Sequence, residues 1–125
     1  MSVYLDTHVA LWLYAGEIAR ISRKAASVIN REEVRASPFV LLELQYLYEI
    51  GCLTASPHTV VAELKRRIGL SMPNRSLDEI AEQALELAWT RDVFDRFIVA
   101  QAALDSPALV TTDRTIRKHY PKAVW

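Results

Sequence analysis

The sequence predicts an α/β protein in which helices cover both faces of a parallel sheet. Short, apolar, β-prone segments alternate along the chain with longer segments of helical periodicity, which is the order of elements that produces such a sheet. The 125 residues fit one domain, and an apolar fraction of 51% is enough for a sizeable core. We therefore expect a single domain spanning residues 1–125.

The first third of the chain is predicted from an apolar run and from helix caps. Residues 3–5 (Val-Tyr-Leu) are apolar and β-prone, which indicates a buried strand that ends at Asp6. Thr7 and Ser22 carry hydroxyl groups that can cap the start of a helix. The expected elements are a strand over residues 3–5, helices over residues 8–14 and 22–30, and a short strand over residues 34–37.

Proline and glycine mark the helix ends in the middle of the chain. Pro38 suits the first position of a helix, and Gly51 and Gly69 stop helices. Pro73 argues against a central strand in the segment 70–74, which is therefore an edge strand or a loop. The expected helices cover residues 38–50 and 57–68.

The last third is again predicted from caps and apolar runs. Ser76 with Glu79 resembles a capping box, and Asp92 can cap the next helix. Either Thr112 or Asp113 can cap a short helix that ends at about residue 119. The expected elements are helices over residues 77–88 and 93–104, a strand over residues 109–111, that short helix, and a last strand over residues 123–125.

Two aspartates follow predicted strands, one near each end of the chain. Asp6 comes directly after residues 3–5, and Asp113 comes just after residues 109–111. In a parallel sheet covered by helices, the functional site lies outside the carboxyl ends of the strands. We therefore expect both carboxylates on one rim of the sheet.

Glu43 and Asp95 lie among apolar neighbours, unlike most of the acidic residues. The helical neighbours of Glu43 are apolar or aromatic, and the helix that begins near Asp95 is almost wholly apolar after Arg96. Such a carboxylate loses hydration and needs a cation or strong hydrogen bonds to stay charged. Glu43 could instead pair with a core arginine or a tyrosine hydroxyl, and Asp95 could simply complement the helix dipole. Capping alone explains Asp92, with a water-mediated contact to a metal as the alternative.

Carboxylates that gather in one place repel one another unless a cation neutralises them. Oxygen ligands suit Mg²⁺ or Mn²⁺, and two such ions can activate a water and stabilise both the attacking and leaving oxygens of a phosphodiester. No Cys/His spacing suits zinc, and no Gly-rich phosphate loop is present. The pattern predicts an Mg²⁺ or Mn²⁺ site formed by Asp6, Glu43, Asp95 and Asp113.

Charge and hydropathy limit the possible partners. Fifteen basic residues balance fifteen acidic ones, so the net charge gives no argument for nucleic acid. Contact with RNA would need cations beside the acidic site, and Arg91, Arg96 and Arg114 flank these acids. The N-terminus lacks a secretory pattern and no apolar run could cross a bilayer, so we expect a cytoplasmic protein without membrane contact.

Several stretches of the chain match a known family in order and spacing. They are Tyr4-Leu5-Asp6-Thr7-His8, Ser37-Pro38 with Glu43 following, Arg91 to Ala102, and Leu109-Val110-Thr111-Thr112-Asp113. On these residues the chain resembles the PIN-domain nucleases, and more closely the VapC-type toxins of type II bacterial toxin–antitoxin systems. The segment 91–102 is the most specific match. The family often has Pro where Val93 stands, a mild departure because a first-turn position accepts either residue.

The resemblance implies a PIN-like three-layer α/β/α sandwich around a parallel sheet of about five strands, in the order 3-2-1-4-5. It also implies a metal-dependent endoribonuclease that cleaves RNA phosphodiester bonds by metal-activated water. By that match Asp6, Asp95 and Asp113 would be direct metal ligands, and Glu43 would bind metal or orient its water. Thr112 would support the site by hydrogen bonding.

Similar toxins form homodimers and are inhibited by a cognate antitoxin, which inserts a segment into a groove near the site. Two sets of apolar residues could line such a groove here, with ordinary core packing as the alternative. They are Leu11, Trp12 and Tyr14 on one helix and Leu41, Leu44 and Tyr48 on another.

Other functions on a similar sheet fit less well. A phosphoryl-accepting receiver domain needs an acidic pair after its first strand, and a phosphatase with an aspartyl nucleophile needs an Asp where His8 stands. The alternative that stays open is a PIN module that acts in RNA processing, or that binds RNA or protein without catalysis. The intact set of acids argues against a loss of catalysis.

Overall fold

The computed structural model describes residues 1–105 and 108–125. One or more helices separate consecutive strands along these residues. Their order is β1 (Ser2–Leu5), α1 (Thr7–Ala15), the 3₁₀ helix η1 (Ile18–Arg20), α2 (Arg23–Arg31), β2 (Glu33–Arg35), α3 (Pro38–Glu49), α4 (Pro57–Ile68), α5 (Leu77–Leu85), α6 (Val93–Asp105), β3 (Leu109–Val110), α7 (Arg114–His119) and β4 (Ala123–Val124).

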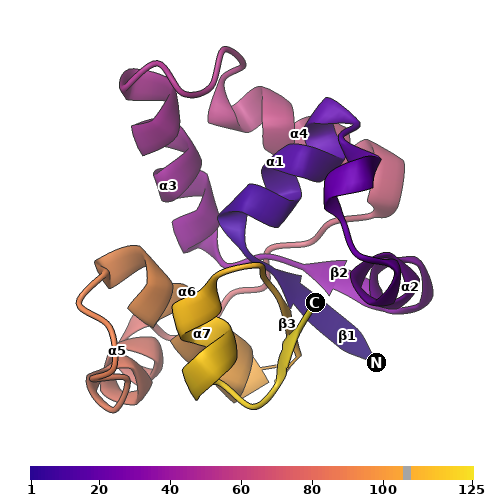
Figure 1. The fold of residues 1–125 in the computed structure, drawn as a ribbon. Helices are drawn as coiled ribbons and strands as arrows, with labels where there is room; N and C mark the ends of the chain where they lie inside the picture. Colours follow the sequence, from indigo (N-terminus) through magenta and orange to yellow (C-terminus); the bar gives the residue numbers. More distant parts are fainter. Residues whose placement is uncertain (106–107) are drawn as a thin grey trace.

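The four strands form a parallel sheet in the order β2-β1-β3-β4, so β1 and β3 are central. In Figure 1, α1 and α4 lie above the sheet, whereas α5, α6 and α7 lie below it. The predicted α/β fold with a covered parallel sheet is confirmed. Because the two central strands have helices on both sides, their residues are apolar and fully buried, from Val3 in β1 to Val110 in β3.

The predicted sheet of about five strands is reduced to four strands and one bridge. Ser71 pairs with Arg35 through a single parallel bridge at the outer edge of β2. The segment 70–74 is therefore a loop that touches the sheet edge, at the place where the order 3-2-1-4-5 has its third strand. Pro73 has no N–H to donate, which explains why the pairing does not extend.

Most of the predicted helix starts are confirmed by side-chain caps. Ser22 accepts a hydrogen bond from the N–H of Ala25, and Asp113 accepts one from the N–H of Ile116. Asp92 accepts one from the N–H of Asp95 at 3.0 Å, as its predicted capping role requires. Each of these bonds satisfies a donor that the first helical turn leaves unpaired.

Two predicted caps are wrong. Asp6, not Thr7, caps α1, because the Asp6 carboxylate accepts a hydrogen bond from the Thr7 N–H at 2.8 Å. Ser76 forms no side-chain cap on α5, and Glu79 bonds the Arg75 guanidinium at 3.0 Å instead of completing a capping box. Helix α5 also ends at Leu85, three residues before its predicted end.

The described helices are short. Among residues 1–105 and 108–125, no helix has both the length and the apolar character needed to cross a membrane.

Candidate metal centre

A pocket of about 170 Å³ opens at the carboxyl ends of the central strands. Seven residues from five segments line it: Asp6, His8, Glu43, Asp92, Asp95, Thr112 and Asp113. All four acids proposed from the sequence lie in its wall, together with Asp92 and Thr112. The topology explains this, because β1 and β3 are parallel neighbours, and Asp6 and Asp113 follow their ends at the same edge of the sheet.

Asp6 is the most buried acid of the pocket, with 7% of its surface exposed. One carboxylate oxygen accepts the Thr7 N–H at 2.8 Å, and the other accepts the Thr111 hydroxyl at 2.5 Å. Burial raises the pKa of Asp6 even though these two hydrogen bonds act in the opposite direction. Asp6 is thus held in one orientation at a desolvated position.

Glu43 projects from α3 toward Asp6. Its Oε1 accepts a short hydrogen bond from the hydroxyl of Thr7. This partner differs from the alternative left open by the sequence, since no arginine or tyrosine hydroxyl among the described residues forms a hydrogen bond with Glu43. Burial raises the pKa of Glu43, and repulsion by Asp6 and Asp92 adds to the rise.

Asp95 lies in the first turn of α6, and its pKa is strongly raised. Burial is the largest cause, and repulsion by the other pocket acids adds to it, so that the pKa of Asp95 rises to about 8. The four contributing acids are Asp6, Asp92, Asp113 and Glu43. Four other carboxylates thus repel the charged form of Asp95.

Two threonines that support the site, Thr7 and Thr111, were not singled out for that role from the sequence. Thr7 holds Glu43, and the Thr111 hydroxyl donates to Asp6 while accepting the Asp113 N–H at 3.0 Å. Thr112 lines the pocket, but the hydrogen bond to a carboxylate comes from Thr111. Thr111 gave no local signal, because its position beside Asp6 depends on the pairing of β1 with β3.

The predicted RNA-contacting arginines lie outside the pocket wall. Arg96 donates to the Ala84 and Leu85 carbonyls at 3.1 and 3.3 Å, which holds its side chain at the end of α5. Arg91 donates to the Ala88 carbonyl at 2.7 Å. Arg114 is exposed at the start of α7. Among the residues that the structure describes, no lysine or arginine lines the pocket, and His8 is the one nitrogen-bearing side chain beside the five carboxylates.

The chemistry of the donor set fits a divalent cation such as Mg²⁺ or Mn²⁺. The pocket offers only hard oxygen donors and one imidazole, and its volume suffices for hydrated ions. Within residues 1–105 and 108–125, no three His, Cys, Asp or Glu side chains are arranged as ready-made ligands. Mutual repulsion keeps unneutralised carboxylates apart, and a bound cation would favour a closer arrangement.

Comparisons with known proteins identify the family of this chain. The family model described as the PIN domain matches residues 3–121. Ribonuclease VapC22 of Mycobacterium tuberculosis is 31% identical to this chain, over 99% of the chain and 98% of the relative.

Solved structures show the same fold at lower sequence identity. A chain of VapBC2 from Rickettsia felis, bound to a promoter DNA fragment, has a TM-score of 0.67 and 17% identity, covering 98% of this chain and 96% of that one. A toxin–antitoxin complex from Klebsiella pneumoniae gives a TM-score of 0.67 and 18% identity, with the same coverage.

Proposed function

Since the chain belongs to the PIN domain family, we propose that it is a metal-dependent endoribonuclease and the toxin of a toxin–antitoxin pair. The observation that carries the proposal is the pocket whose described wall has five carboxylates and no lysine or arginine. The resemblance to ribonuclease VapC22 over nearly the full length of both chains supports RNA as the substrate. The cytoplasm, where RNA is accessible, is its proposed location.

In this proposal Asp6, Asp95 and Asp113 hold Mg²⁺ or Mn²⁺. The bound metal supplies an activated water and neutralises charge on the phosphodiester. Thr111 keeps Asp6 oriented through its hydroxyl. Thr7 fixes the Glu43 carboxylate, which can then bind metal or orient the attacking water.

The phosphate backbone needs cations outside the pocket, because the pocket itself is anionic. Arg114 follows Asp113 directly and is exposed, so it is placed to contact a phosphate beside the cleaved bond. Arg91 is also exposed, but its guanidinium already donates a hydrogen bond to the Ala88 carbonyl. Arg96 is the least available of the three predicted arginines, because two carbonyls of α5 hold it.

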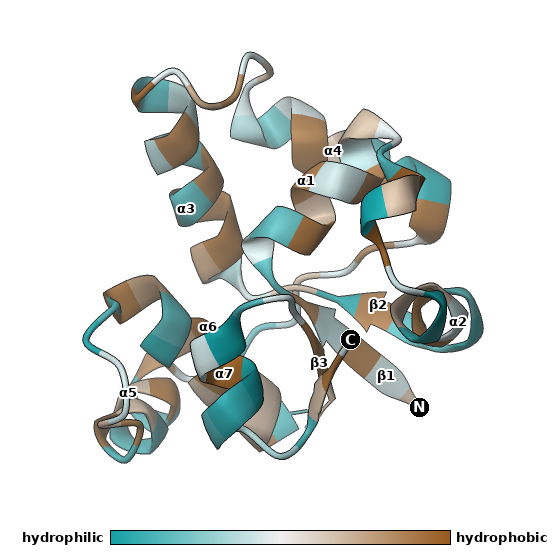
Figure 2. Ribbon diagram, viewed as in Figure 1, coloured by the Kyte–Doolittle hydropathy of each residue, from teal (hydrophilic) through white to brown (hydrophobic). Residues whose placement is uncertain are grey.

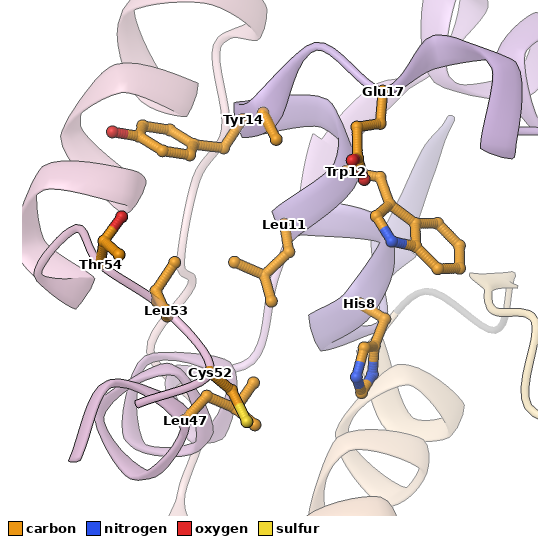
Figure 3. A pocket seen from close by; sticks show the side chains of 10 residues that line it. His8, Leu11, Trp12, Tyr14, Glu17, Leu47, Cys52, Leu53 and Thr54 are labelled. Atoms are coloured by element: carbon orange, nitrogen blue, oxygen red, sulfur yellow. The ribbon is translucent and has the colours of Figure 1, made fainter. Parts of the chain in front are cut away.

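An apolar groove beside the acidic pocket is the proposed site for an antitoxin segment. The groove has a volume of about 440 Å³ and lies between α1 and the end of α3 (Figure 3). Leu11, Trp12 and Tyr14 line it, as predicted for the first apolar set. Of the second set, Leu44 is fully buried in the core, and the groove takes Leu47 and Leu53 instead. A homodimer is also part of the proposal.

The ribonuclease proposal is tested with purified protein and single-stranded RNA. We expect cleavage with Mg²⁺ or Mn²⁺, no cleavage after addition of EDTA, and recovery when either metal is restored in excess. Cleavage that continues in EDTA would show that the acidic pocket does not hold a required metal. The toxin proposal is tested separately, since expression should arrest growth and co-expression of a small neighbouring gene should relieve the arrest.

A further inference from the structure

A stacked pair of aromatic rings joins two segments that lead into the acidic pocket. Trp89 lies between α5 and α6, and His119 is the last residue of α7. Their ring centroids are 5.2 Å apart and their planes differ by 4°, so the rings are parallel. Asp92 follows Trp89 by three residues, and α7 begins directly after Asp113. The stacked pair therefore lies near two walls of the pocket.

The helix that carries His119 is basic. Helix α7 is hydrophilic along most of its length in Figure 2, and its exposed residues include Arg114, Arg117 and Lys118. Within residues 1–105 and 108–125, these three side chains have no carboxylate partner, whereas Arg20, for example, pairs with Glu17 at 3.4 Å. Positive charge without an internal partner is thus available to an anion outside the molecule.

The ring pair is close enough to the pocket to contact the same nucleic acid strand. A helix rises by 1.5 Å per residue, so the six residues of α7 place His119 about 9 Å along the helix from Asp113. This is a length of about one or two nucleotides in an extended strand. His119 is exposed, and Trp89 is partly exposed.

We propose that Trp89 and His119 form a platform on which an unpaired RNA base stacks next to the cleaved phosphodiester. The proposal rests on the ribonuclease function proposed above. Proteins that bind single strands combine aromatic rings, which stack on bases, with cations that follow the backbone, and α7 supplies both beside the pocket. A paired base cannot reach such a platform, so the substrate class is RNA that is single-stranded at the cleavage site.

The test pairs a protein variant with a missing base. The cleaved bond is first mapped in a short single-stranded oligoribonucleotide, and abasic nucleotides are then placed at successive positions around it. With the wild-type protein, one abasic position should lower kcat/KM by about 5- to 150-fold, the usual range for a lost stacking contact. The Trp89→Leu variant should show a similar loss with the intact oligonucleotide.

The decisive measurement combines the two changes, with the abasic oligonucleotide cleaved by the Trp89→Leu variant. If the base stacks on Trp89, the abasic position should cost the Trp89→Leu variant almost nothing more, because the contact is already absent. Trp125→Leu is the matched control, since Trp125 contacts Trp12 rather than His119. In the control, the abasic penalty should remain as large as in the wild-type protein.

The proposal is overturned if the abasic penalty is equally large in wild-type and Trp89→Leu protein at every position. It is also overturned if fully duplex RNA is cleaved as well as single-stranded RNA. His119→Leu, at an exposed position, carries the same test if Trp89→Leu does not fold. A wild-type protein that cleaves no RNA with metal would overturn the proposed function itself, and with it the platform.

Discussion

Helix α6 has an aspartate near each end, and the charged groups around the two carboxylates are opposite in sign. Asp95 in the first turn lies among four other carboxylates, with no lysine or arginine in the pocket wall. Asp105 at the last position accepts hydrogen bonds from Tyr4 at 2.6 Å and Arg35 at 3.0 Å, and Arg75 lies 3.7 Å away. The two aspartates are ten positions apart, which corresponds to about 15 Å along the helix.

This difference separates a carboxylate that arginines neutralise inside the fold from one that no arginine or lysine of the described pocket wall neutralises. Asp105 joins α6 to β1 and β2, and its charge is matched by two arginines inside the protein. Burial and the neighbouring acids raise the pKa of Asp95, which costs stability in the absence of a cation. A carboxylate cluster that the fold does not neutralise is therefore best explained by a ligand that does so.

The largest expected effect is on catalysis, and it should distinguish the two aspartates. Asp95→Asn should lower kcat/KM for RNA cleavage at least about a thousandfold, because a proposed metal ligand is lost. Asp105→Asn should retain activity within about tenfold of the wild-type protein, since Asp105 does not line the pocket. Cleavage assays at saturating Mg²⁺ measure both, with circular dichroism as the control for folding. Equal losses in the two variants would contradict the distinction.

The threonines beside the pocket should have intermediate effects. Thr111→Val removes the hydroxyl that orients Asp6, so we expect about a 10- to 100-fold loss in metal affinity or activity. Thr112→Val is the matched control and should lose much less, because no hydrogen bond joins Thr112 to a pocket acid in the described residues. Mg²⁺ titration of cleavage rates measures the difference. The inference about Thr111 fails if Thr112→Val is the more damaging variant.

For the free energy of unfolding we expect the reverse order, with Asp105→Asn more damaging than Asp95→Asn. Asp105→Asn removes the shorter of the two carboxylate contacts of the partly buried Arg35 and leaves only Glu33 at 3.5 Å. We expect a loss of about 1–3 kcal/mol in the free energy of unfolding. Asp95→Asn in metal-free buffer should be neutral or stabilising, because it removes repulsion among the pocket acids. Urea denaturation in EDTA measures both. A larger destabilisation by Asp95→Asn would reverse the assignment.

The smallest expected effect is a dependence of metal-free stability on pH. The pKa of Asp95 rises from its ordinary 3.8 to about 8 in the folded protein, so between these values the folded state binds more protons than the unfolded chain. Its contribution to stability is therefore present at low pH and is lost as pH rises through this window. Urea midpoints in EDTA should fall with pH, and less steeply in Asp95→Asn. Midpoints that rise across the window would contradict the assigned shift.

The sequence predicted those features of the site that depend on local pattern. Asp6 and Asp113 were found because each follows a strand, and Glu43 and Asp95 because their helical neighbours are apolar. The partners of Asp105 could not be found in this way, since Tyr4 and Arg35 lie 101 and 70 residues away along the chain. Their meeting depends on strand order and on how α6 packs, which no local window contains.

The predicted helices illustrate the same limit. Ser22, Asp92 and Asp113 were recognised as caps because a cap and its donor are within a few residues of each other. The predicted cap of α1 was wrong because the Thr7 hydroxyl donates its hydrogen bond to Glu43, 36 residues away. Tertiary contacts therefore decided the outcome where two local assignments were possible.

The hydrogen bond between Asp6 and Thr111 has a consequence for synthesis of the protein. The two residues are 105 positions apart, so the orientation of the first acid depends on a segment that leaves the ribosome very late. Asp113 comes later still. A growing chain that lacks β3 has neither of these groups and cannot assemble the pocket. The acidic pocket is therefore complete only after nearly the whole of this domain has been translated.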